Sequence, residues 1–127
     1  MKASELRIGN YFNEVTQFCT IQKRIQPYHL VEMFQCEIAM VENPYSPVTL
    51  TEEWLSKLGF YRFNPENYPN RWTFKDAQAD YTIYIYPKTI TICIDDSNYG
   101  REIPYVHILQ NVWYALEDKE LILNPAQ

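Results

Sequence analysis

The sequence predicts an α+β fold, and three segments carry the prediction. YTIYIYPKTITICI (residues 81–94) alternates isoleucine with tyrosine, threonine or cysteine, which is the period of a β-strand. LTEEWLSKLGF (50–60) holds the start and stop signals of a short helix. PYVHILQNVWYALEDKEL (104–121) spaces its apolar residues by three and four, as an amphipathic helix does. A sheet and helices of this kind must pack together to bury their apolar faces.

The composition is that of one soluble globular domain. The chain has 127 residues, of which 46% are hydrophobic and 21% charged, so it can bury a core without staples. Its formal net charge of −5 argues against duplex nucleic acid as a partner, because that binding needs clustered Lys and Arg. No apolar leader occurs, and no apolar run reaches the roughly 18 residues of a transmembrane helix. We therefore expect a cytoplasmic protein without membrane contact. Cys19, Cys36 and Cys93 are widely spaced, which predicts buried free thiols.

Residues 1–42 are predicted to form a small antiparallel β unit. Gly9 and Asn10 suit a tight turn. The segments VTQFCTIQKRI (15–25) and YHLVEMFQCEIAMV (28–41) alternate imperfectly, which favours three or four short strands in all. The proline-rich segment 43–50 then leads into a helix–meander–helix part, residues 43–127, of the same single domain, 1–127.

A short helix is predicted near residues 51–58. Thr51 can cap its first turn by accepting a backbone hydrogen bond. Gly59 can adopt the left-handed conformation that ends a helix. Leu50 is placed to contact Leu55 as a hydrophobic staple. A second helix is predicted near residues 104–117, with Pro104 at its first position.

Between the two helices we expect a β-meander over residues 71–95. If a turn is centred on Pro87 and Lys88, the residue numbers of each cross-strand pair add up to 175. Ile83 therefore faces Ile92. A third strand begins at residue 71, and a loop over 76–81 would place Phe74 opposite Ile83 and Trp72 opposite Ile85. The predicted core consists of Trp54, Leu58, Trp72, Phe74, Ile83, Ile85, Ile90, Ile92, Leu109 and Leu116.

The opposite face of this meander is the candidate binding site. Arginine can fork onto a phosphate or carboxylate, and tyrosine offers a base a rigid stacking surface. This combination favours a small anionic ligand such as a nucleotide. Two other interpretations stay open: a solvated sheet face of ordinary composition, or a face covered by the N-terminal strands. The candidate ligand-binding residues are Arg71, Lys75, Tyr84, Tyr86 and Thr91.

No catalytic or metal-binding motif stands out. His29 and His107 have no ligand at metal spacing, which favours structural roles for both. Three glycines in the whole chain leave no glycine-rich phosphate loop. The pair Asp95 and Asp96 precedes Ser97 and is typical of a turn. We expect no metal, no cofactor and no catalytic residue, and therefore a protein that acts by binding.

Three segments carry a resemblance: ELRIGNYF (5–12), PVTLTEEWLSKLGF (47–60) and YVHILQNVWYAL (105–116). In this order they resemble small, largely uncharacterised proteins encoded in genomes, prophages and mobile elements of Bacteroidetes-type bacteria. In such proteins the last segment is usually more polar at the position of Ile108. The resemblance implies a phage or mobile-element origin and supplies no catalytic residues.

That origin suggests three functions in order of preference. The first is sequestration of a nucleotide-type signal to counter host defence. The second is inhibition of a host defence protein by direct contact. The third is an unrecognised hydrolase. The sequence leaves the ligand, the host partner and the oligomeric state open, a homo-oligomer included.

Overall fold

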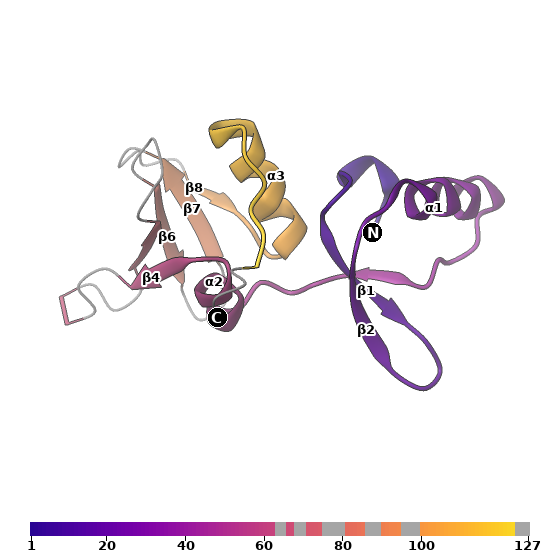
Figure 1. Cartoon of the computed structure of the whole chain (residues 1–127), viewed down its shortest axis with the longest axis horizontal. Helices are drawn as coiled ribbons and strands as arrows, with labels where there is room; N and C mark the ends of the chain where they lie inside the picture. Colours follow the sequence, from indigo (N-terminus) through magenta and orange to yellow (C-terminus); the bar gives the residue numbers. More distant parts are fainter. Residues whose placement is uncertain (63–65, 68–70, 75–80, 86–89, 95–99, 124–127) are drawn as a thin grey trace. The chain divides into compact units, whose positions relative to one another are not determined.

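The computed structural model describes residues 1–62, 66–67, 71–74, 81–85, 90–94 and 100–123, with the backbone alone for 81–85, 93–94, 100 and 101. The described residues confirm the α+β class, because helices accompany two antiparallel sheets (Figure 1). The chain separates into two compact units. Unit 1 comprises Met1–Thr49 and Tyr105–Val112, and unit 2 comprises Leu50–Pro104 and Trp113–Gln127.

Unit 1 contains a three-stranded sheet, a helix beside it (Figure 1) and the first part of the C-terminal helix. The strands are ordered β2-β1-β3, and β1 is antiparallel to both neighbours. One buried apolar cluster joins the sheet, the helix and the N-terminal turn; it contains Ala3, Leu6, Phe12, Ile25, Met33 and Tyr45. The elements are η1 (Ala3–Glu5), β1 (Tyr11–Val15), β2 (Thr20–Arg24), α1 (Pro27–Ala39) and β3 (Tyr45–Pro47).

Helix α1 shows that the strand predicted over residues 28–41 is wrong. Pro27 occupies the first turn, where its missing N–H costs no hydrogen bond. Gln26 and His29 form a reciprocal capping box, in which the backbone N–H of Gln26 donates to His29 Nδ1 (2.9 Å). Met40 ends the helix in the left-handed conformation (φ 56°). The segment is apolar on two opposite faces of the helix, and this pattern imitates an imperfect strand alternation.

Unit 2 is a five-stranded antiparallel sheet in the order β4-β5-β6-β7-β8. The three inner strands are the predicted meander. The outer two come from segments in which the sequence predicted no strand, because short edge strands have little periodicity to detect. Helix α3 follows the sheet in the chain, and its second half belongs to unit 2. The elements are α2 (Glu52–Lys57), β4 (Phe60–Arg62), β5 (Arg71–Phe74), β6 (Tyr81–Ile85), β7 (Ile90–Ile94), β8 (Gly100–Glu102) and α3 (Val106–Glu117).

Helix α2 forms as its local signals predict. Thr51 Oγ1 accepts a hydrogen bond from the backbone N–H of Trp54 (3.3 Å). Gly59 follows the helix with φ +102°, and a Cβ atom there would meet the Phe74 ring at 3.0 Å. Both the backbone conformation and the close aromatic ring therefore require glycine at this position.

The predicted strand register is confirmed for the pair β6–β7 and wrong for the pair β5–β6. In β6 and β7, Ile83 faces Ile92 and Tyr84 faces Thr91, as predicted. In β5 and β6, Trp72 faces Ile83 and not Ile85. A shift of two residues leaves every side chain on its own face of the sheet, so the apolar pattern cannot distinguish the two registers.

Half of the predicted core residues whose side chains the structure describes are buried, and one of the others is clearly exposed. Leu58, Trp72, Ile92 and Leu109 are buried, whereas Leu116 is 42% exposed. Trp54, Phe74 and Ile90 are half-buried, and the side chains of Ile83 and Ile85 lie outside the described residues.

Trp113 explains why Leu116 lies outside. Its ring packs edge-on against Phe60 and Phe74, with ring centroids 5.5 and 4.7 Å apart. The buried stripe of α3 therefore continues four residues later at Glu117, which is 5% exposed, and Leu116 turns outward.

Candidate functional site

The predicted binding residues lie on one face of the unit 2 sheet where the structure describes them. The registers align Arg71, Tyr84, Thr91 and Glu102 as direct cross-strand partners on four successive strands. We call these four positions the polar row. Arg71 and Thr91 are half-buried and Glu102 is exposed. Lys75 and Tyr86, like the side chain of Tyr84, lie outside the described residues.

The polar row has the groups for one charged ligand, but not a uniform charge. Direct cross-strand neighbours stand about 5 Å apart, so a ligand the size of a phosphate can contact two of them. Arg71 lies at one end and Glu102 at the other. Because the carboxylate of Glu102 repels an anion, an anionic group would bind at the Arg71 end of the polar row.

A second candidate surface, not foreseen as such in the sequence, covers the outside of α1. Tyr28, Val31, Phe34 and Ile38 are 62%, 56%, 49% and 82% exposed. Their spacing of three, three and four residues confines them to about a third of the helix circumference. The buried His29 and Met33 lie on the opposite side. We call the four exposed residues the outer face of α1.

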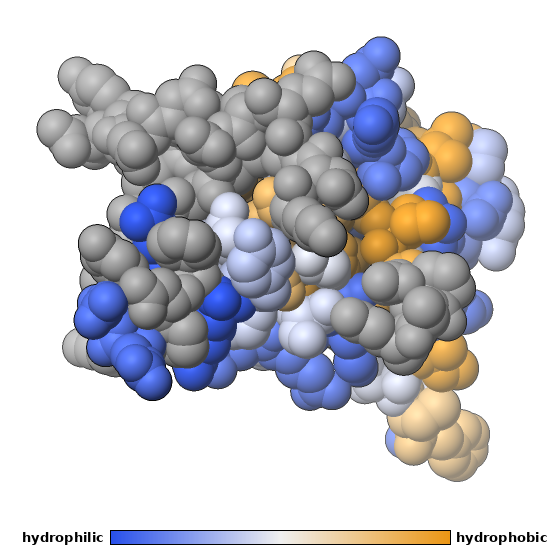
Figure 2. All heavy atoms as spheres, turned by 60° about the vertical axis from the view of Figure 1, so that its left-hand side comes forward, coloured by the Kyte–Doolittle hydropathy of each residue, from blue (hydrophilic) through white to orange (hydrophobic). Residues whose placement is uncertain are grey.

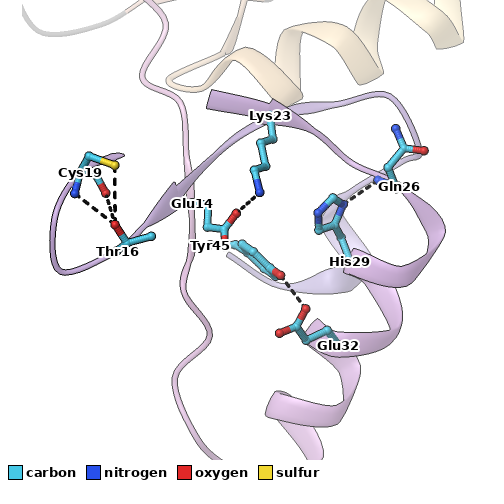
Figure 3. A network of polar contacts seen from close by, with 8 residues as sticks. All are labelled: Glu14, Thr16, Cys19, Lys23, Gln26, His29, Glu32 and Tyr45. Carbon is cyan, nitrogen blue, oxygen red and sulfur yellow. Dashed lines mark hydrogen bonds and ion pairs between the residues drawn. The ribbon is translucent and has the colours of Figure 1, made fainter. Parts of the chain in front are cut away.

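Polar contacts hold α1 in this rotation (Figure 3). On the sheet side, the Tyr45 hydroxyl donates to Glu32 Oε2 (2.6 Å). The Ala3 backbone N–H donates to Glu37 Oε1 (2.7 Å). Burial, together with the hydrogen bond to Glu32, raises the pKa of the Tyr45 hydroxyl, so it remains a donor at physiological pH. These contacts fix which side of the helix meets the sheet, and they leave the outer face turned away from it.

Apolar surface is visible in the space-filling view, where orange areas lie between blue hydrophilic ones (Figure 2). Beyond the outer face of α1, unit 1 exposes Met40 (93%) and Val41 (58%) directly after the helix. The β1–β2 hairpin exposes Phe18 (87%). Exposed apolar side chains that gather on one surface are typical of interaction sites, and the four residues of the outer face of α1 gather in this way.

A buried network of amides connects the two ends of the chain in unit 1. The Tyr11 backbone N–H donates to Gln110 Oε1 (2.9 Å), and Asn10 Nδ2 donates to Asn111 Oδ1 (2.9 Å). Arg7 Nε also donates to Asn111 Oδ1 (3.0 Å). Asn10 and Gln110 are fully buried. A buried polar network stabilises a fold when its donors and acceptors have hydrogen-bond partners. These residues have such partners, so we assign them a structural role.

The network joins segments 5–12 and 105–116, two of the three that carry the resemblance. The remaining segment, 47–60, contacts 105–116 through backbone hydrogen bonds. The Val106 N–H donates to the Val48 carbonyl (2.9 Å), and Thr49 forms a β-bridge with Tyr105. No local pattern in the sequence marks Asn10, Gln110 and Asn111 as a group. Segments 5–12 and 105–116, in which these three residues lie, were the signal in the sequence that could have pointed to them.

The two histidines are buried, but their partners differ. His29 Nδ1 accepts the capping hydrogen bond from Gln26. Neither ring nitrogen of His107 has a hydrogen-bond partner within the described residues, and its Nε2 lies 3.9 Å from Glu5 Oε2. Burial lowers the pKa of both imidazoles. Both are therefore neutral at physiological pH.

The prediction of buried thiols is wrong for Cys19, which is exposed. Its backbone is held in the β1–β2 turn by Thr16, which accepts a hydrogen bond from the Cys19 N–H (3.1 Å). Cys36 is half-buried. The side chain of Cys93 lies outside the described residues.

The described residues hold neither a candidate metal site nor a candidate membrane-spanning helix. In those residues, no three His, Cys, Asp or Glu side chains approach closely enough to hold a metal ion. The same part of the chain contains no helix with the length and apolarity to cross a bilayer.

No protein-family model, curated protein or solved structure matches the chain.

Proposed function

We propose that this protein acts by binding another protein through the outer face of α1. The observation that carries the proposal is the exposure of Tyr28, Val31, Phe34 and Ile38 along one side of a helix whose other side is already packed. A surface helix of a globular domain normally has one apolar stripe. A second apolar stripe lowers the solubility of the protein and adds nothing to its core. A partner protein that covers the stripe removes this disadvantage.

The charges around the outer face indicate the kind of partner. Residues 27–42 contain three acids, Glu32, Glu37 and Glu42, and no Lys or Arg. Glu32 and Glu37 lie beside the outer face on its two flanks, because 100° per residue places them on either side of the stripe. A groove or helix with apolar residues and a Lys or Arg rim complements this pattern. A second copy of α1 would instead set acids opposite acids, so we propose a different protein as the partner.

The proposed partner is a host defence protein. This step depends on the phage or mobile-element origin that the three sequence segments imply, and on the acidic, apolar character of the outer face. Binding alone is enough for such a role, since a protein that covers a functional surface of its target needs no chemistry of its own.

The test compares variants in capture from host lysate. Phe34→Ser and Ile38→Ser remove apolar area from the outer face, and Leu116→Ser is the matched control because Leu116 is an exposed apolar residue of another helix. We expect one identified protein to be retained by wild type and by Leu116→Ser, and lost with both α1 variants. Retention by all four proteins would overturn the proposal.

Size measurement separates the second-copy alternative. We expect wild type to elute as a monomer in light-scattering chromatography. A dimer that dissociates on Phe34→Ser substitution would show that a second copy occupies the outer face, and the host-partner proposal would then be wrong.

A small anionic ligand on the polar row is the second candidate function. The observation that favours it is the register that sets Arg71, Tyr84 and Thr91 side by side across three strands. Calorimetric titration with cyclic and linear nucleotides tests it on wild type, Arg71→Ala and Tyr84→Ala, with Tyr114→Ala as the control at an exposed helix position. Stacking of a base on an aromatic ring contributes about 1–3 kcal/mol to the binding free energy. Tyr84→Ala should therefore weaken binding roughly 5- to 150-fold. If wild type binds no nucleotide, this candidate is excluded.

A further inference from the structure

Unit 2 contains a cavity that neither proposed surface uses. It is open on one side, has a volume of about 310 Å³ and lies where the end of α2, strand β5, helix α3 and the segment after α3 meet. This volume is at the lower limit of the range typical for small-molecule sites. The lining is drawn from unit 2 alone; its apolar members include Leu58, Phe74, Trp113, Leu121 and Ile122.

The walls are aromatic and firmly placed. Phe74 and Trp113 pack edge-to-face at 4.7 Å, and Phe60 supports both rings from behind with centroids at 5.0 and 5.5 Å. Gly59 belongs to the lining, and a Cβ atom there would meet the Phe74 ring at 3.0 Å. The rings are thus held by their neighbours, which lowers the entropy lost when a ligand packs against them.

Among the described residues of the lining, one acid is buried. Glu117 is part of the lining, is only 5% exposed and already takes part in an interaction within the protein, so the proposed ligand would add a second contact to this acid. At the mouth, Glu120 and Lys119 are exposed and offset each other. A carboxylate in a site of low dielectric favours a ligand that brings a positive charge, and it disfavours an anion.

We propose that this cavity binds a small aromatic amine, with the ring against Phe74 and Trp113 and the ammonium group at Glu117. The ligand would bury apolar surface on the rings, and its cation would form a charge-assisted hydrogen bond with the carboxylate. The site is independent of the outer face of α1 and of the polar row, so it adds a binding activity to either proposed function.

Three matched probes test the proposal: phenethylamine, 2-phenylethanol and 3-phenylpropionate, which share the phenyl ring and differ in charge. We expect wild type to bind the amine at least about tenfold more tightly than the alcohol, since hydrogen bonds to charged groups exceed neutral ones by roughly that factor. The acid should bind most weakly. In nitrogen–proton spectra, the amine should shift the indole signal of Trp113, identified by its loss in Trp113→Phe.

Glu117→Gln keeps the shape of the wall and removes its charge. We expect the preference for the amine over the alcohol to disappear in this variant and to persist in Glu120→Gln, the control at the mouth. Equal binding of amine and alcohol by wild type would overturn the proposal, as would no binding of any probe at millimolar concentration. A preference that survives Glu117→Gln would also overturn it. If Glu117→Gln does not fold, the wild-type ranking and the Trp113 signal decide the question.

Discussion

The side-chain carbonyl of Gln110 accepts a hydrogen bond from the backbone N–H of Tyr11 at 2.9 Å, across 99 positions of the chain. Both residues are buried. The same side chain donates through Nε2 to the Gly9 carbonyl (3.4 Å). One amide of α3 therefore satisfies backbone groups on both sides of Asn10, where β1 begins.

Replacing Gln110 by leucine should destabilise the protein strongly. The leucine preserves the volume but removes the acceptor of the buried Tyr11 N–H, at about 1–3 kcal/mol, whereas the Gly9 carbonyl still accepts a hydrogen bond from Arg24 Nε (3.0 Å). Urea denaturation measures the loss. Gln22→Leu is the control, because Gln22 is exposed on β2, and it should change stability by less than about 0.5 kcal/mol. Equal midpoints for the two variants would show that the network does not stabilise unit 1.

Leu109 and Leu116 make a matched pair on α3. Leu109 is fully buried and Leu116 is 42% exposed, although the sequence placed both in the core. Leu109→Ala should cost about 2–5 kcal/mol in the free energy of unfolding. Leu116→Ala should cost less than about 1 kcal/mol, since the truncated side chain leaves no cavity. Thermal and urea melts of the two variants measure the difference, and a larger loss at Leu116 would contradict the described rotation of the helix.

Met33 and Ile38 make the same comparison on α1. Met33 is fully buried against the unit 1 sheet, whereas Ile38 is 82% exposed on the outer face. We expect Met33→Ala to cost about 2–5 kcal/mol. Ile38→Ala should be close to neutral or slightly stabilising, because alanine has the higher helix propensity. Circular dichroism during urea titration provides the measurement. A clear destabilisation by Ile38→Ala would mean that the outer face is packed in the isolated protein.

Acidification should weaken the fold through His107. Burial lowers the pKa of this imidazole below its ordinary value of 6.5, while the carboxylate of Glu5 opposes the shift. Below pH 6.5 the unfolded chain therefore binds a proton that the folded chain does not. The free energy of unfolding that His107 contributes is fully present above pH 6.5. It falls as the pH drops from 6.5 to the lower pKa of His107 in the folded protein, by at most about 1.4 kcal/mol per pH unit for one group.

The check is urea denaturation of wild type and His107→Leu between about pH 7.5 and pH 5.5, the window around the ordinary histidine pKa. His29 has a lowered pKa as well, so the variant should keep part of the slope. We expect the slope to be smaller in His107→Leu than in wild type. Identical slopes would show that His107 does not contribute.

The sequence alone determined the elements whose signals are local. Thr51 and Gly59 mark the two ends of α2, because a cap and a left-handed stop depend only on neighbouring backbone groups. The strict alternation over residues 81–94 likewise determined the β6–β7 pairing, since a tight turn leaves one register in which the faces do not mix. The face shared by Arg71, Tyr84 and Thr91 followed from the same parity.

Only the tertiary structure decided the features that depend on distant partners. Residues 28–41 have apolar groups on both faces of a helix, and no local rule shows which face meets the sheet; Tyr45, Ala3 and the capping by His29 decide it. The aromatic contacts of Trp113 bury Glu117 and expose Leu116. Hydrogen bonds between residues about 100 positions apart bring Gln110 to Tyr11. Sequence periodicity reports how residues repeat along one element, whereas the rotation of that element is set by the surface against which it packs.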